Sequence, residues 1–213
     1  MHTILTIGHS SHPIAEFVRL LSDHQIDVVA DVRSSPYSKR NPQFSRESLQ
    51  KSLKDQGVKY LFLGRELGAR RTERECYVQG KAEYERIAEL PAFNDGVRRL
   101  LKGASDYRIA LMCAEQDPLT CHRTVLVCRH LKKHGLALGH ILPDGNVESH
   151  EQVEHRLMLE EGENPSQADI FAVAENLDSA LLRAYTARGN KIAYLEHGTA
   201  NENSYDRLYQ EEC

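Results

Sequence analysis

Several features that define common protein classes are missing from this 213-residue sequence. Tryptophan is absent and aromatic residues make up only 7%, so an aromatic platform for stacking nucleic-acid bases is weakly supported. No run of about 18 apolar residues exists, so we expect no membrane-spanning helix. Neither G-x-G-x-x-G nor a Walker A pattern occurs, so we expect no site of either type and no redox cofactor.

Cysteines are few as well. The five cysteines are an odd number at irregular spacing, which argues against a disulfide framework and favours a cytoplasmic location. No C-x-x-C pair occurs, and Cys113 and Cys121 are separated by seven residues, so we predict no metal site. The opening MHTILTIGHSSHP has neither a basic segment nor a long apolar run, so we expect no signal peptide.

Apolar residues make up 40% of the chain, which is enough for a real core. Strands are predicted in TILTIGH, DVVADV, VKYLFL, YRIALMC and LALGHIL. Helices are predicted between them over residues 13–26, 45–57, 82–102 and 123–135, with a bend or restart at Pro91. The stretch 64–81 has few apolar residues and is predicted to be a long loop.

Strands that alternate with helices are typical of a parallel sheet with right-handed crossovers. We therefore predict a single α/β domain over residues 1–150, with a mostly parallel sheet of five or more strands flanked by helices. Beyond residue 148 the pattern weakens, and residues 151–213 are predicted to form a C-terminal extension that is helical and then loose.

Positive charge is concentrated in one segment of this acidic protein. Between Arg33 and Arg74 there are eleven Lys and Arg residues against four Asp and Glu residues. Local basicity in a chain with a net charge of -4 indicates an anionic partner at one face, although lysines such as Lys51 and Lys54 fit a solvated helix equally well.

Polar side chains follow every predicted strand, and the carboxyl ends of parallel strands are where such folds bind ligands. The acid–base candidates in these loops are His9, Glu66, Glu115 and His122. The candidates for binding an anionic substrate are Ser10, Arg33, Ser35, Arg65 and Arg123. Two alternatives stay open: Arg33 forms a structural ion pair with Asp31, and His9 caps a backbone group.

The stretch CAEQDPLTCHR at residues 113–123 adds a candidate thiol site. Cys113 ends a strand and Arg123 opens the next helix, so a thiolate here would be stabilised by helix N-terminal amides and an arginine. This order resembles the rhodanese and cysteine-phosphatase arrangement, but the loop has no glycine, and Glu115 and Asp117 would repel an anion. Cys113 and Cys121 are candidate nucleophiles, and burial as small apolar residues is the alternative.

Five motifs in order carry a resemblance to a known family. The segments TIGHS, DVRSSPYS, YLFLGRELG, ALMCAEQDPLTCHR and GHILPDG together resemble the DUF488 family over about residues 3–150. The resemblance implies a single α/β domain and supplies no reaction. Its matching positions that bear on a site are His9, Ser10, Asp31, Arg33, Ser35, Arg65, Glu66, Cys113, Glu115, Cys121, His122 and Arg123.

The leading hypothesis is an enzyme that carries out hydrolysis or group transfer on a phosphate-bearing substrate, such as a nucleotide or a nucleic acid. The first alternative is a rhodanese-like or phosphatase-like thiol enzyme that uses Cys113 or Cys121. The second alternative is a non-catalytic module that binds nucleic acid.

Overall fold

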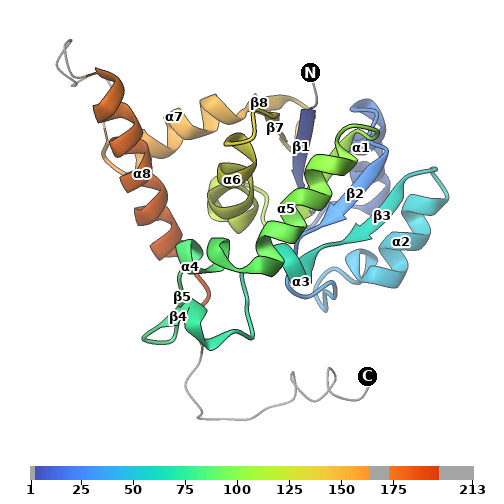
Figure 1. The fold of residues 1–213 in the computed structure, drawn as a ribbon. Coiled ribbons are helices and arrows are strands. Elements are labelled where there is room, and N and C mark those ends of the chain that lie inside the picture. Colours follow the sequence, from blue (N-terminus) through green and yellow to red (C-terminus); the bar gives the residue numbers. More distant parts are fainter. Residues whose placement is uncertain (1–2, 164–172, 197–213) are drawn as a thin grey trace.

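A six-stranded sheet forms the centre of the computed structural model, which describes residues 3–163 and 173–196 (Figure 1). The strand order is β3-β2-β6-β1-β7-β8. The five predicted strands are all present and mutually parallel: β1 (Thr3–Gly8), β2 (Val28–Asp31), β3 (Lys59–Phe62), β6 (Ile109–Cys113) and β7 (Ala137–Ile141). A sixth strand, β8 (Val147–Ser149), pairs antiparallel with β7. The predicted α/β class with a mostly parallel sheet is confirmed.

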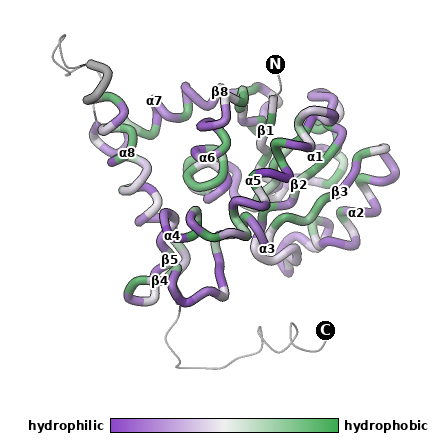
Figure 2. The backbone as a smooth tube through the Cα atoms, in the orientation of Figure 1, coloured by the Kyte–Doolittle hydropathy of each residue, from purple (hydrophilic) through white to green (hydrophobic). Residues whose placement is uncertain are grey.

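Helices cover both faces of the sheet. On one face, α1 (Ile14–Asp23), the short helix η1 (Pro42–Phe44) and α2 (Arg46–Lys54) bury Phe17, Phe44 and Leu49. On the other face, α4 (Tyr84–Glu89) and α5 (Pro91–Gly103) bury Phe93 and Val97. The predicted restart at Pro91 is confirmed, because proline fits the first turn of a helix, where its missing N–H has no partner to lose. Figure 2 shows apolar residues in the strands of the sheet, and polar and apolar residues alternating along the helices around them.

The stretch 64–81 differs from the predicted loop. It contains α3 (Gly64–Leu67), the short helix η2 (Arg74–Cys76) and a small hairpin of β4 (Tyr77–Val78) and β5 (Lys81–Ala82). The side chain of Arg71 organises it, donating to the carbonyl of Arg65 at 2.6 Å and to the carboxylate of Glu73 at 2.6 Å. This order comes from polar contacts, which hydrophobic periodicity does not reveal.

The predicted helix at 123–135 is present in an altered form. It begins as a π-helical segment, η4 (Arg123–Cys128), and continues as α6 (Arg129–Lys132). The chain leaves this helix through Gly135, whose φ of 72° suits a residue without a side chain. Wide π-helical turns recur at functional sites, because they change the direction in which side chains leave a helix.

The C-terminal extension packs on the same core as the sheet. Helix α7 (His150–Glu160) starts with a capping box between Ser149 and Gln152, and α8 (Val173–Ile192) follows. The buried side chains of Val153, Leu157 and Tyr185 join the core cluster on the α5 face. The predicted helical character is therefore present. The extension is also predicted to become loose toward its end, and residues 197–213 of that segment lie outside the described residues.

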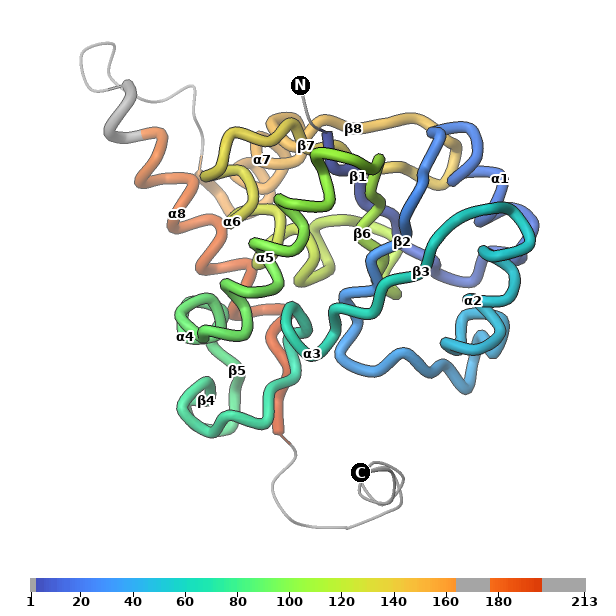
Figure 3. Tube along the Cα trace, turned by 45° about the vertical axis from the view of Figure 1, so that its right-hand side comes forward, coloured from blue at the N-terminus to red at the C-terminus, as the bar shows by residue number. Residues whose placement is uncertain are grey.

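After α8 the chain returns toward the hairpin of β4 and β5 (Figure 3). The amide of Ala82 donates to the carbonyl of Tyr194 at 2.9 Å, and the amide of Glu196 donates to the carbonyl of Gly80 at 2.7 Å. The extension therefore reaches the side of the molecule where the strands of the sheet end. None of the described helices is long and apolar enough to cross a membrane.

Candidate active site

A cavity of about 830 Å³ lies beyond the carboxyl ends of β1, β2 and β6. The strand order explains the position of this cavity. The chain runs from β1 toward one edge of the sheet, to β2 and then β3, whereas from β6 it runs toward the opposite edge, past β1 to β7. The loops therefore diverge where Gly8 of β1 pairs with Cys113 of β6, and such a switch point leaves a crevice. Eight of the eleven predicted site residues line this cavity: His9, Ser10, Arg33, Ser35, Cys113, Glu115, Cys121 and His122.

Arg33 is held in a buried network rather than free for a substrate. Its Nε and Nη2 donate to the carboxylate of Asp31 at 2.9 and 2.6 Å, and Nη2 also donates to the carbonyl of Phe44 at 2.9 Å. The hydroxyl of Tyr60 donates to the same carboxylate at 2.8 Å. For Arg33, the sequence left open a substrate-binding role and a structural ion pair with Asp31. The ion pair is present, and it anchors the loop that forms one side of the cavity.

His9 has partners at both ring nitrogens. Its Nδ1 lies 2.9 Å from the carbonyl of Ser10 and must donate, whereas its Nε2 lies 3.1 Å from Nη1 of Arg33 and must accept. Burial and the charge of Arg33 lower the pKa of His9 to about 4. The ring is also stacked on Phe44, with centroids 4.3 Å apart. A neutral ring with both nitrogens engaged supports the wall and leaves no nitrogen for the predicted proton transfer.

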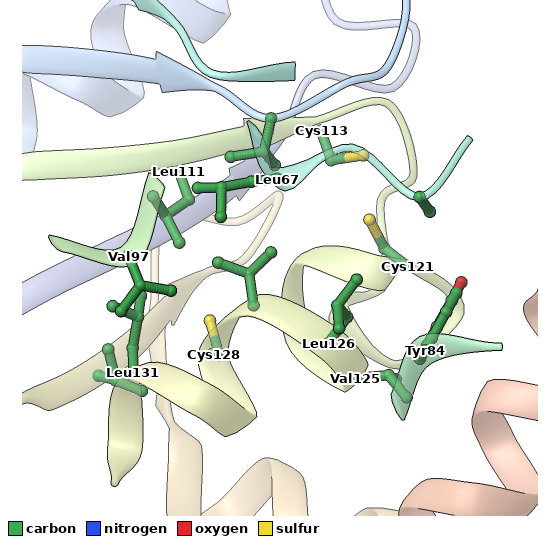
Figure 4. Packing of buried hydrophobic residues seen from close by; sticks show 14 of the residues in the cluster. Leu67, Tyr84, Val97, Leu111, Cys113, Cys121, Val125, Leu126, Cys128 and Leu131 are labelled. Atoms are coloured by element: carbon green, nitrogen blue, oxygen red, sulfur yellow. The ribbon is translucent and has the colours of Figure 1, made fainter. Parts of the chain in front are cut away.

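The floor of the cavity is a cluster of Cys113, Glu115, Cys121 and His122, which we call the thiol cluster. Cys113 Sγ lies 3.0 Å from Oε2 of Glu115 and 3.7 Å from Nδ1 of His122. Cys121 Sγ lies 3.8 Å from the same Nδ1. Figure 4 shows the two sulfur atoms turned toward one another, with Cys128 farther along the helix among aliphatic side chains.

Electrostatics distinguish the two thiols of this cluster. Burial and the charge of Cys121 hold the pKa of Cys113 well above its usual range. Burial would also raise the pKa of Cys121, but the hydrogen bond from Cys113 and the positive charge of Arg123 hold it well below its usual range. Desolvation by the cavity walls raises the pKa of Glu115. Of the two thiols, Cys121 is therefore the one that loses its proton more readily.

Arg123 positions the floor from outside the cavity. The residue is 1% exposed, and its guanidinium donates to the carbonyls of Glu115 and Gln116 at 2.6 and 3.0 Å. Two of its donors therefore bind backbone carbonyls, its Nε has no hydrogen-bond partner among the described residues, and Arg123 is not among the residues that line the cavity. Its role in the fold is to fix the loop that carries Glu115.

Two other predicted residues lie outside the cavity lining. Glu66, on α3, forms an ion pair with Arg99 of α5. Arg65 is exposed on α3, and its carbonyl accepts from Arg71. Both follow strand β3, which lies at the edge of the sheet, so α3 directs them away from the switch point between β1 and β6.

Several lining residues lie outside the predicted set. The cavity is also lined by the exposed Arg40 and Arg70, and by Tyr84 and Tyr194. Both arginines belong to the basic segment from Arg33 to Arg74, and that local positive charge was the sequence signal that could have found them. Nothing else in the sequence distinguishes these two from the other basic residues of the segment. Tyr194 had no such signal, because it reaches the cavity only through the return of the chain after α8.

Comparison with known proteins identifies the family. The family described as "Domain of unknown function DUF488" matches residues 13–129, which is more than half of the chain. This range contains the thiol cluster and the Asp31–Arg33 pair, whereas TIGHS and GHILPDG fall outside it. No curated protein and no solved structure matches the chain. The chain therefore belongs to the DUF488 family, as its five motifs indicated.

Proposed function

We propose that this protein is an enzyme that carries out hydrolysis or group transfer on a small phosphate-bearing substrate. The observation that carries the proposal is a single cavity with two exposed guanidinium groups in its lining and an acid–base cluster at its floor. Neither Arg40 nor Arg70 has a carboxylate partner within the described residues, and the floor holds Glu115 and His122 beside two thiols.

The lining suits a phosphate group. Guanidinium groups bind phosphate oxygens through charge-assisted hydrogen bonds, and Arg40 and Arg70 supply them at the mouth of the cavity, its solvent-exposed edge. The hydroxyls of Ser34 and Ser38 accept from backbone amides at 2.9 and 3.0 Å, so each still has a hydrogen to donate. Arg70 also lies over the ring of Tyr194, which holds the guanidinium group against the wall.

Glu115 supplies the base for the reaction. In hydrolysis, its carboxylate takes a proton from the attacking water while the water oxygen bonds to phosphorus. The ester oxygen leaves as its bond to phosphorus breaks, and the proton on Glu115 passes to that oxygen. In group transfer, an acceptor hydroxyl takes the place of water in the same sequence.

The dimensions of the cavity favour a small molecule. A volume of about 830 Å³ falls within the usual range for sites that enclose one small ligand. A nucleotide or a similar phosphate ester fits that volume, whereas a nucleic acid would have to place a single terminal group there. The low aromatic content points in the same direction.

Phosphate release from a panel of nucleotides, sugar phosphates and short oligonucleotides tests this proposal. We expect the wild-type protein to turn over at least one small phosphate ester, and Glu115→Gln to slow it by about 100-fold or more, the usual contribution of a general base. Glu89→Gln is the matched control, because Glu89 is exposed at the end of α4. Equal rates in wild type and Glu115→Gln would contradict the assignment of the base.

A thiol enzyme is the second candidate, and one contact favours it. Cys121 Sγ accepts from the backbone amide of Arg123 at 3.4 Å, at the start of η4, which is a favourable place for a thiolate. In this reaction, the Cys121 thiolate would form a bond to phosphorus as the bond between phosphorus and the ester oxygen breaks, and the leaving oxygen would take a proton. Water would then displace the thiolate and release phosphate. Cys121→Ser would then abolish turnover, whereas Glu115→Gln would reduce it by much less than the 100-fold loss expected above.

A further inference from the structure

We propose that Cys113, Cys121 and His122 bind one zinc ion at the floor of the cavity, with its fourth coordination position facing the cavity. The ligand atoms of these three residues, two Sγ and one Nδ1, all lie within 4.8 Å of one another. All three residues also line the cavity, so an ion held between them would be reachable by a small molecule.

The distances suit tetrahedral coordination. Zinc binds sulfur at about 2.3 Å and imidazole nitrogen at about 2.0–2.1 Å, which places a sulfur and a nitrogen ligand about 3.6 Å apart in a tetrahedron. The observed separations between Nδ1 of His122 and the two sulfur atoms are 3.7 and 3.8 Å. Little movement is needed to admit an ion.

His122 is already oriented as a ligand. Its Nε2 lies 2.9 Å from the carbonyl oxygen of Val32, and since a carbonyl only accepts, Nε2 must carry the hydrogen. When the ring is neutral, as a metal ligand must be, Nδ1 presents its lone pair to the two sulfur atoms. A histidine that ligates a metal nearly always donates its other N–H to a carbonyl or carboxylate, and Val32 supplies that partner here.

The loop between the ligands is held in place. Arg123 binds the carbonyls of Glu115 and Gln116, and Asp117 accepts two hydrogen bonds from Arg156, each at 3.0 Å. Cys113 therefore stays beside Cys121 despite the seven residues between them. The sequence prediction of no metal site relied on short ligand spacing, which a fixed loop between a strand end and a helix start does not require.

The ligand set favours zinc. Two thiolates and one imidazole are the three protein ligands of catalytic zinc sites of the Cys₂His type. In those sites, water or substrate takes the fourth position. Oxygen-preferring ions such as Mg²⁺ would not select this set. Glu115 lies beside the ligand set, with Oε2 at 3.0 Å from Cys113 Sγ.

The catalytic use of this ion rests on the proposed function, but its binding does not. If the substrate is a phosphate ester, water at the fourth position would lose its proton to Glu115 and bond to phosphorus as the ester oxygen leaves, and that oxygen would take the proton from Glu115. Absence of turnover would count against the reaction alone. Absence of metal binding would count against the site alone.

Titration of the reduced, metal-free, full-length protein with Co²⁺ tests the site without any substrate. We expect one equivalent of Co²⁺ to produce a thiolate-to-cobalt charge-transfer band and intense visible bands of tetrahedral cobalt, and one equivalent of Zn²⁺ to remove both. Bound cobalt without a charge-transfer band, or no binding by the wild-type protein, would overturn the proposal.

Thiol variants assign the ligands. Cys113→Ser and Cys121→Ser should each weaken zinc binding by at least tenfold and remove charge-transfer intensity. The matched controls are Cys76→Ser and Cys128→Ser, because both thiols are buried but lie outside the ligand group. Circular dichroism checks that each variant is folded. Equal zinc affinity in the Cys121 and Cys128 variants, both folded, would overturn the assignment.

Alkylation of the wild-type protein needs no variant and separates the metal site from the thiol enzyme. We expect one equivalent of Zn²⁺ to protect Cys113 and Cys121 from iodoacetamide, as read by mass spectrometry of peptides, and a chelator to reverse the protection. Rapid modification of Cys121 at the same rate with and without zinc would overturn the metal site and favour the thiol nucleophile.

Discussion

The backbone carbonyl of Glu115 lies directly against Gly8. A Cβ atom on residue 8 would stand 1.9 Å from that oxygen, far inside van der Waals contact. Gly8 is the last residue of β1 and pairs with Cys113, so the close approach joins the end of one central strand to the loop that carries the proposed base. Glycine at this position therefore sets where Glu115 can lie.

Gly8→Ala is expected to displace the loop at residues 114–117. The variant should remain folded but lose much of its turnover. A side chain forced into a packed region costs about 1–3 kcal/mol of unfolding free energy. Chemical denaturation and the phosphate-release assay should be run on the same samples. Gly103→Ala is the control, because its nearest neighbour would be the end of a side chain at 3.1 Å. Full activity in Gly8→Ala would contradict this role.

Removal of Arg33 is expected to destabilise the fold. Arg33→Ala leaves the carboxylate of Asp31, 0% exposed, without its ion-pair partner, and breaking a buried pair costs about 3–5 kcal/mol. Urea denaturation measures the loss. Asp31→Asn/Arg33→Ala should recover part of it, because the uncompensated charge is then gone. A loss of ligand binding at unchanged stability would instead return Arg33 to the role of a substrate-binding residue.

Acid is expected to weaken the folded state through its buried histidines. Burial lowers the pKa of His140 and His150, and the pKa of His9 to about 4. Between the ordinary value of about 6.5 and these lower values, the unfolded chain binds protons that the folded chain does not. The contribution of these three histidines to stability is therefore complete above about pH 6.5 and falls as the pH drops toward 4.

The size of this effect is measurable with one variant. Each such histidine contributes a slope of up to about 1.4 kcal/mol per pH unit to the unfolding free energy. His140→Gln should reduce the slope between pH 6.5 and 5 by about one histidine's share, whereas His134→Gln, at an exposed position, should leave it unchanged. Identical slopes in wild type and His140→Gln would refute the assignment.

Most of the fold follows from local patterns in the sequence. Apolar strands such as VVAD at residues 28–31 alternate with amphipathic helices, and that alternation alone predicts a parallel sheet. The order within 64–81 does not follow, because it depends on contacts of Arg71 with groups that only the folded chain brings near. The edge strand β8 is three residues long, too short to show a period.

The position of the site was predictable from the sequence, but the roles of its individual residues were less so. The rule that ligands bind beyond strand ends selected Cys113, Glu115 and His122 correctly as cavity residues. It also selected Arg123, whose donors turn inward to backbone carbonyls. Sequence shows that a residue follows a strand but not which way its side chain points, and that direction separates Arg123 from Arg40.

The most direct test of the central claim is calorimetric titration of a nucleotide or other phosphate ester into the wild type and the Arg40→Ala/Arg70→Ala double variant. Loss of charge-assisted hydrogen bonds at an exposed site should weaken binding by about 1–3 kcal/mol, or about 5- to 150-fold, with wild-type affinity falling as salt rises. The charge-matched control is Arg19→Ala/Arg98→Ala, at exposed positions on α1 and α5. Equal affinity in the two double variants would contradict a phosphate site at the mouth of this cavity.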